Sequence, residues 1–345
     1  MRRRLWGVFL VAIALDFASG WWLLSRLQYG HGADEDLAKK GDLVSIREAF
    51  VTESTPDLGL FALPPDALAA RGFRTETPES IETWKRENLP RIPYLDAATI
   101  AALPEEPVAR ARAIALLYSV NGGAICGGFE NLLDALQRMP QGYGCCSDHG
   151  EGFLALGQAL GLTVREVHHT EHAFNEFWVP ALGKWVFIDT QYALMARDPD
   201  GTWLGAFEIR ERLREGKPFE YDFFGGPRHA FAKGFPWKTP WDSPYYNDIE
   251  GFKNLRLIWG SNIYEQDRFE ARLAWLPRAA RHVIGHLVGV FPPRVLYADA
   301  LTTDATELAR KRAVVTALLI FLPIGTLLAP WLLLRTRARR RPKLR

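Results

Sequence analysis

Three residues whose side chains suit covalent catalysis follow one another along the chain: Cys146, His172 and Asp189. A cysteine thiolate is a strong nucleophile, an imidazole can take up and return its proton near neutral pH, and a carboxylate can orient that imidazole. Ser/His/Asp and Cys/His/Asn triads divide the work in this way. If the fold brings the three side chains together, these residue types predict acyl transfer through a thioester on Cys146.

Cys146 is predicted to lie in the first turn of a helix. The helix covers about Asp148–Leu160, ends at Gly161, and buries an apolar stripe formed by Phe153, Leu156 and Leu160. The positive end of the helix dipole and the unpaired backbone N–H groups of the first turn favour a thiolate. We therefore expect a reactive thiol at Cys146.

Short strands are predicted to position His172 and Asp189. Three strand-like runs follow the helix: Thr163–His168, His172–Val179 and Lys184–Thr190. Antiparallel pairing of the last two brings His172 and Asp189 to one end of the sheet, on one face with Trp185 and Phe187. We expect that face to pack on the helix, which gives an α+β domain.

Four short segments in this order resemble the transglutaminase-like core, which is related to papain-like cysteine peptidases. They are Cys146-Ser-Asp148, the run from Leu154 to Arg165, His172-Ala-Phe-Asn-Glu176, and Trp185-Val-Phe-Ile-Asp189-Thr. The resemblance spans about Ala113 to Asp189. It implies that Cys146 is the nucleophile, His172 the base and Asp189 the third member of a triad, whereas Cys145 is displaced from the motif by one residue.

Members of this family include acyltransferases, peptidases, deamidases, amidases and inactive relatives, so the resemblance implies a site more firmly than a reaction. The chain departs from the usual pattern at Gly150, Gln158 and Thr190-Gln191, which leaves the substrate open. The backbone N–H of Cys146 is the natural first oxyanion donor. Candidates for the second donor are Gln141, Gln137, Tyr118 and Trp84.

Other polar residues near the motif have structural and functional interpretations. Asp148 and Glu176 are supporting residues, expected to hold the helix start and the strand in place. A disulfide between Cys126 and Cys145 would leave Cys146 as the odd thiol. A metal cluster is the weaker interpretation of the residues His168, His169, His172, Glu166 and Glu171, because no chelating cysteine or distant second ligand set accompanies them. The sequence predicts neither a metal nor a cofactor.

Both ends of the chain are basic and apolar. Ala313–Leu334 lacks charges over a length that spans a bilayer, and Leu5–Leu24 follows Arg2-Arg3-Arg4. Cationic residues at both extremes predict cytoplasmic termini and a body on the far side of the membrane. Residues 28–334 carry a net charge of about −8, which argues against nucleic-acid binding by the body.

The sequence predicts six segments. They are an N-terminal anchor (1–27), an irregular lead-in rich in proline (28–105), a catalytic domain (106–250) whose first helices are Pro107–Val120 and Phe129–Met139, a C-terminal extension (251–312), a transmembrane helix (313–334) and a basic tail (335–345). Within the extension, residues 278–291 are either a membrane-surface helix or a core helix. The aromatic run from Phe235 to Tyr246 is expected to pack a long loop; the alternative is that its rings stack on sugars or line a groove for the acyl acceptor.

Together these patterns predict a membrane-anchored, extracytoplasmic transglutaminase-like cysteine acyltransferase or amidohydrolase. Its partners would be the membrane and a protein, peptide or envelope-polymer substrate. One alternative is a cysteine peptidase or deamidase. The other is a non-catalytic scaffold of an envelope or polysaccharide-export assembly.

Overall fold

The computed structural model describes residues 46–118, 129–169, 172–225, 246, 248–276, 278–317, 331 and 335. The chain divides into two compact units, one of residues 51–303 and the other of residues 1–50 together with 304–345. In the latter unit the described residues 46–50 and 304–317 are helical. Arg312 Nε there donates a hydrogen bond of 2.8 Å to the Ala49 carbonyl.

The unit of residues 51–303 is built on one mixed sheet of eight strands in the order β1-β8-β7-β2-β3-β4-β5-β6. Their bounds are Thr52–Thr55 (β1), Val164–His168 (β2), Ala173–Val179 (β3), Lys184–Asp189 (β4), Leu194–Arg197 (β5), Glu220–Phe223 (β6), Arg256–Ile258 (β7) and Arg294–Tyr297 (β8). All pairs are antiparallel except β1 and β8. The predicted three-strand meander is the centre of this sheet.

Helices cover both faces of the sheet. Helix α3 (Ile46–Val51) belongs mainly to the other unit. Among the described residues of 51–303, the α-helices are Gly59–Ala62 (α4), Pro65–Ala70 (α5), Pro78–Asn88 (α6), Ala97–Ala101 (α7), Pro107–Tyr118 (α8), Leu132–Arg138 (α9), Cys146–Ala159 (α10), Ala206–Glu215 (α11), Ile249–Phe252 (α12), Ile263–Arg272 (α13) and Arg278–Leu287 (α14). Short 3₁₀ turns cover Leu89–Arg91 (η1), Met139–Gln141 (η2) and Pro180–Leu182 (η3). The α+β class is confirmed.

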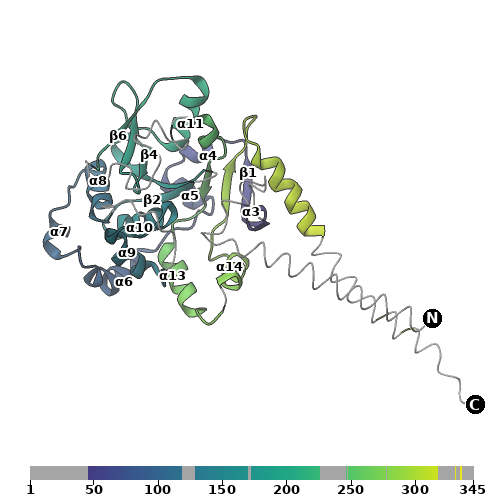
Figure 1. Ribbon diagram of the computed structural model, residues 1–345, viewed down its shortest axis with the longest axis horizontal. Coiled ribbons are helices and arrows are strands. Elements are labelled where there is room, and N and C mark those ends of the chain that lie inside the picture. Colours follow the sequence, from purple (N-terminus) through teal and green to yellow (C-terminus); the bar gives the residue numbers. More distant parts are fainter. Residues whose placement is uncertain are drawn as a thin grey trace, which may run out of the picture. The chain divides into compact units, whose positions relative to one another are not determined.

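Two hydrophobic cores lie on the two faces. On the α10 side, Phe177, Val186 and Ile188 meet apolar residues of α6, α8, α9, α10 and α13. On the α11 side, Phe174, Trp185 and Phe187 meet apolar residues of α4, α5, α11 and α12. Figure 1 shows α6, α9, α10 and α13 on one side of β2, and α4 and α11 on the other.

The prediction that Trp185 and Phe187 face the helix of Cys146 is wrong. Both side chains belong to the α11-side core, whereas Val186 and Ile188 face α10. The reason is that β4 is buried on both faces from Trp185 to Asp189. A strand with two apolar faces gives no alternation from which the sequence could distinguish them.

The segment predicted to be irregular differs from that expectation over its described part. Residues 46–105 contain helices from α3 to α7 and strand β1. Two of the prolines that suggested irregular structure, Pro65 and Pro78, instead occupy first-turn positions of helices, where a missing N–H costs nothing. Likewise, β7 and β8 of the predicted C-terminal extension pair within the main sheet, next to β2.

The predicted membrane segments fall largely outside the described residues. Residues 5–24 are not described, and of residues 313–334 only 313–317 and 331 are. Among the residues that the structure describes, no helix has the length and apolar composition that a membrane crossing requires.

Candidate active site

Cys146 is the first residue of α10, as the sequence predicts. The helix begins there because the Asp148 carboxylate accepts a hydrogen bond of 2.8 Å from the backbone N–H of Cys145, one half of a capping box. Gly144 turns the chain into the helix with φ 98°, in the left-handed region that favours glycine. Asp148, predicted as a supporting residue, thus lies at the helix start.

His172 and Asp189 form a buried pair at one end of the sheet. His172 precedes β3 and Asp189 ends β4, and the distance between His172 Nε2 and Asp189 Oδ2 is 2.5 Å. The exposed fractions of the two residues are 4% and 0%. The second carboxylate oxygen, Oδ1, accepts a hydrogen bond of 3.1 Å from the backbone N–H of Tyr192. The carboxylate is therefore held at both oxygens.

The sulfur of Cys146 lies near the start of β3 and near Asp189. It receives a hydrogen bond from the backbone N–H of Ala173, the residue that follows His172, and it experiences the charge of Asp189. Farther along α10, the His149 carbonyl accepts hydrogen bonds from Thr190 Oγ1 (3.2 Å) and from the Tyr118 hydroxyl (3.1 Å). The first bond joins α10 to the end of β4, where Asp189 lies, and the second joins α10 to α8.

The protonation of the thiol differs from the expectation. The surroundings raise the pKa of the Cys146 thiol well above its ordinary value, first through its hydrogen bond with the Cys145 thiol and then through burial. The Ala173 N–H acts in the opposite direction. The neighbouring thiol and burial thus oppose the activation predicted from the helix dipole and favour a neutral thiol at Cys146.

Tyr246 is a site residue that the sequence analysis missed. Its hydroxyl donates a hydrogen bond to Asp189 Oδ2 and lies 3.1 Å from His172 Nε2, and its side chain is fully buried. It belongs to the aromatic run from Phe235 to Tyr246, for which the sequence predicted no contact with the triad. No local signal marks one tyrosine in such a run, because the contact joins residues 57 positions apart.

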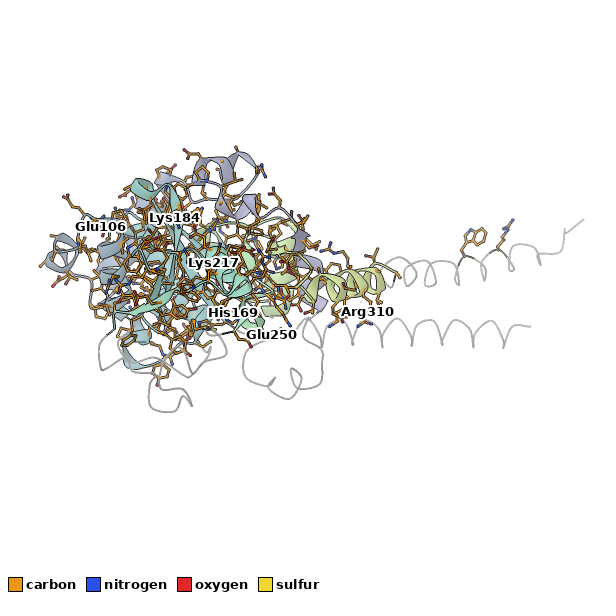
Figure 2. The ribbon with its side chains drawn as sticks, turned by 90° about the horizontal axis from the view of Figure 1, so that it is seen from above. Glu106, His169, Lys184, Lys217, Glu250 and Arg310 are labelled. Atoms are coloured by element: carbon orange, nitrogen blue, oxygen red, sulfur yellow. The ribbon has the colours of Figure 1, made fainter. Side chains whose placement is uncertain are left out.

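A second histidine lies at this end of the sheet. The ring of His169, which follows β2, is centred 5.6 Å from that of His172, and its side chain is buried. Burial is the main cause that lowers the pKa of His169 well below its ordinary value, and the neighbouring His172 adds to it. His169 follows β2 and Lys184 begins β4, so these two residues, labelled in Figure 2, lie at opposite ends of the strands β2 to β4.

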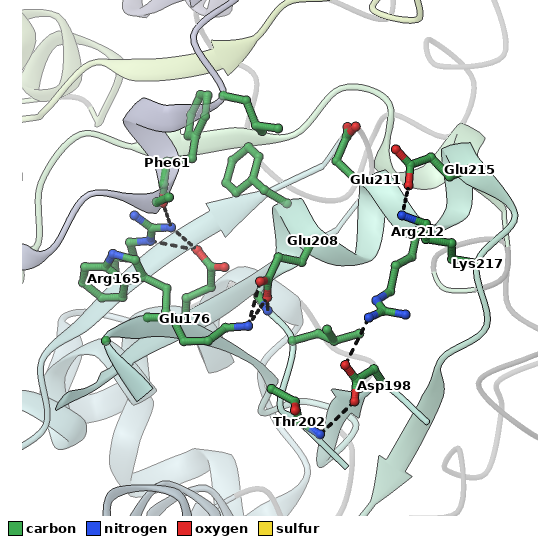
Figure 3. Close-up of a pocket in the computed structure, with 18 residues that line it drawn as sticks. Phe61, Arg165, Glu176, Asp198, Thr202, Glu208, Glu211, Arg212, Glu215 and Lys217 are labelled. Carbon is green, nitrogen blue, oxygen red and sulfur yellow. Dashed lines mark hydrogen bonds and ion pairs between the residues drawn. The ribbon is translucent and has the colours of Figure 1, made fainter. Parts of the chain in front are cut away.

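Glu176, the other predicted supporting residue, lies away from the triad. Its Oε2 accepts a hydrogen bond of 2.8 Å from Arg165 Nε, and its Oε1 accepts one of 2.7 Å from the Ala206 N–H at the start of α11. Arg165 also donates to the Phe61 carbonyl and stacks on the Trp185 ring. Figure 3 shows this pair in the wall of a cavity of about 490 Å³.

The four candidates for the second oxyanion donor have different surroundings. Tyr118 donates to the His149 carbonyl, Gln137 donates to the Arg91 carbonyl, and Trp84 stacks on Tyr264 in the α10-side core. Gln141 ends the 3₁₀ turn that leads to Cys146; its side chain is exposed and donates to the Gln137 carbonyl. Of the four, Gln141 is the exposed side chain on the approach to the helix.

The described residues contain no group of three or more His, Cys, Asp or Glu side chains placed to hold a metal ion. His168 instead contacts Glu166, with 2.5 Å between His168 Nε2 and Glu166 Oε1. Cys145 and Cys146 are both thiols. Cys126 and Glu171, named in the disulfide and metal predictions, lie outside the described residues.

No protein-family model, no curated protein and no solved structure matches this chain.

Proposed function

We propose that this protein is a cysteine acyltransferase or amidohydrolase of transglutaminase-like type, acting on amide bonds of a protein, peptide or envelope polymer. One observation carries the proposal. The thiol at the first position of a helix accepts a hydrogen bond from the amide of Ala173, the residue that follows His172, and His172 forms a buried pair with Asp189. A helix N-terminus that bears a thiol next to an oriented imidazole has the parts that a nucleophilic cysteine requires.

In this mechanism His172 acts first as a general base. Since Nε2 is engaged by Asp189, the other ring nitrogen, Nδ1, takes the proton from the Cys146 thiol as the sulfur attacks the carbonyl carbon. A carbon–sulfur bond forms while the carbonyl electrons move to oxygen. When the carbon–nitrogen bond then breaks, the leaving amine takes the proton from His172 and a thioester remains. Water or a second amine cleaves the thioester and restores the thiol.

The resting neutral thiol fits this order of events. Because the surroundings raise the pKa of Cys146, proton transfer would accompany attack on the substrate rather than precede it. The same observation favours the second candidate, a non-catalytic scaffold that keeps the fold, since an inert thiol is also protonated and partly buried. The two candidates differ in whether Cys146 reacts in a way that depends on His172.

The proposal includes the location of the enzyme. Apolar segments at residues 5–24 and 313–334 with basic flanks favour a protein anchored at both ends in the cell membrane, with the catalytic unit outside the cytoplasm. An extracytoplasmic site would meet envelope polymers and exported proteins as substrates. A peptidase or deamidase would use the same residues with water as the acceptor.

The test is the alkylation rate of Cys146 in the purified full-length chain, with the labelled cysteine mapped by mass spectrometry. General-base assistance contributes about 10² to 10⁴ to rates, so His172→Ala should slow labelling at pH 7 by a large factor. Cys146→Ala should abolish both that label and turnover of an amide substrate. Added primary amine accelerates turnover only for a transferase.

Labelling that is equal in wild type and His172→Ala would overturn the enzyme proposal and leave the scaffold. Cys145→Ala tests the neighbouring thiol separately from the imidazole, because it removes that thiol but retains Cys146 and His172. It should also speed labelling of Cys146, since the hydrogen bond with Cys145 is the largest cause that raises the pKa of Cys146.

A further inference from the structure

Asp189 Oδ2 is shared by two side chains. His172 Nε2 lies 2.5 Å from it, and the Tyr246 hydroxyl donates to the same oxygen while lying 3.1 Å from His172 Nε2. The three groups therefore form a closed triangle in which Tyr246 contacts both members of the pair. All three residues are buried, Asp189 and Tyr246 completely.

The phenol can act only as a donor to the carboxylate. Burial, followed by the charge of Asp189, raises the pKa of Tyr246 well above its ordinary value, so the hydroxyl keeps its proton throughout the neutral range. A hydrogen bond from a neutral hydroxyl to a carboxylate is short and strong compared with one between neutral groups. It stabilises the ionised form of Asp189 without adding a charge.

Tyr246 is itself held in place by its neighbours. The Tyr221 hydroxyl of β6 donates a hydrogen bond of 2.9 Å to the Tyr246 carbonyl, and the rings of Tyr192 and Tyr221 lie edge to face with its ring at 5.9 Å and 5.4 Å. A hydroxyl on a ring packed in this way has little freedom to leave the carboxylate. The contact is therefore part of the packing.

We propose that Tyr246 is a positioning residue of the site: it fixes the Asp189 carboxylate against His172 and limits how strongly that carboxylate holds a proton on the imidazole. The inference rests on the proposed function, because it assigns the pair a task toward Cys146. Without the phenol, the Asp189 carboxylate would lose one of its two side-chain donors and would interact more strongly with a protonated imidazole. His172 would then release its proton at a higher pH.

Other titratable groups also face the pair and must be kept unchanged in the test. They are Cys146 from α10, Cys145 just before it, His169 after β2, Tyr192 after β4, Tyr221 from β6 and Tyr118 from α8; Arg256 from β7 acts on His169. Because Tyr246→Phe keeps the ring, it removes the hydroxyl while it retains these groups.

The experiment follows the titration of His172 by NMR in the full-length chain labelled with ¹⁵N-histidine, with His172→Gln identifying the signal. Tyr246→Phe should move the His172 titration midpoint upward by about one pH unit, the tenfold change expected from losing one charge-assisted hydrogen bond. The control Tyr264→Phe, whose hydroxyl donates to the Ala155 carbonyl, should leave the midpoint in place.

A near-isosteric replacement tests the same bond in the opposite direction. Fluorotyrosine incorporated at position 246 is a stronger donor, so the His172 midpoint should move downward. This variant also decides the question if Tyr246→Phe does not fold. An unchanged midpoint in every folded variant at position 246 would overturn the inference.

Failure of the proposed function has a different signature. In that case the labelling rate of Cys146 is the same in wild type and His172→Ala. The effect of Tyr246 on His172 is measured in the same samples and does not require an active enzyme. The two failures are therefore distinguishable.

Discussion

Two buried carboxylates on neighbouring strands have opposite roles because their partners differ. Glu176 in β3 is matched by Arg165, whose guanidinium stays charged across the physiological range, and by the N–H of Ala206. Asp189 at the end of β4 is matched by the imidazole of His172, a side chain of the type that serves as a general acid or base, and by the Tyr246 hydroxyl. The first pair can only hold α11 and the sheet together, whereas the second can transfer a proton.

Burial of a carboxylate therefore does not by itself mark an active site. Both residues are essentially inaccessible to solvent, and both were selected from the sequence as members or supporters of the site. What separates them is the protonation range of the partner and the presence of a thiol beside one pair. The two regions should also differ in their contribution to stability, in helix packing and in how stability depends on pH.

The largest effect is expected at Glu176. Its replacement by alanine leaves Arg165 buried without its counter-charge, which should lower the free energy of unfolding by about 3–5 kcal/mol. Urea unfolding of the full chain measures the loss. The control Glu220→Ala removes an ion pair with Arg197 at a half-exposed position and should cost less than about 1 kcal/mol. If the two variants lost equal stability, Glu176 would not be a structural anchor.

Two glycines of α10 should respond to alanine with opposite signs. A Cβ at Gly157 would lie 2.6 Å from Cγ2 of Val164, a stiff β-branched neighbour, so Gly157→Ala should destabilise by about 1–3 kcal/mol. A Cβ at Gly150 would meet Glu166 Oε1 at an ordinary 3.6 Å, so Gly150→Ala should stabilise by about 0.5–1 kcal/mol.

Thermal unfolding of the two variants checks this difference. Opposite shifts would show that α10 has room for a methyl group at Gly150, nearer Cys146, and none at Gly157, nearer its end. Melting temperatures that move in the same direction would contradict that description of the helix.

The smallest effect should appear as a dependence of stability on pH at His169. Because the folded state lowers the pKa of this histidine, its neutral form contributes stability above about pH 6.5 that is lost as the pH falls. The loss approaches about 1.4 kcal/mol per pH unit for one proton. His169→Gln should flatten this slope, whereas His282→Gln, at a half-buried histidine paired with Glu270, should not.

Unfolding measurements between about pH 7 and pH 5 give the slopes directly. Equal slopes for wild type and His169→Gln would mean that the acid sensitivity arises elsewhere. A change in the Cys146 labelling rate in the same variant would extend the catalytic region to His169.

The sequence predicts the local parts of the site well, for reasons that lie within a few residues. Cys146 begins a helix because Asp148 caps it three positions into the motif, and Gly161 ends that helix with positive φ. The three central strands follow from apolar runs separated by turn residues. Because antiparallel neighbours are close in sequence, His172 and Asp189 were expected at one sheet end, where the structure has them.

The remaining parts depend on contacts between distant segments and leave no local pattern. Tyr246, whose hydroxyl donates a hydrogen bond to Asp189, lies 57 positions later in the sequence. The prediction of which face of β4 meets α10 was wrong because both faces of this strand are buried. The hydrogen bond with the Cys145 thiol raises the pKa of Cys146, and an argument from the helix dipole does not include that side-chain contact.

The order of the strands has a consequence for how the chain is made. Strand β1 near the beginning pairs in parallel with β8, whose residues 294–297 are synthesised more than 200 positions later. Until they emerge from the ribosome, the only β partner of β1 in this sheet is missing and one edge of the nascent sheet stays open. Pairing across so long a loop is slow, so completion of the fold should be a late event of biosynthesis. A chain stalled before residue 294 would expose an open strand edge, the feature that recruits chaperones or aggregates.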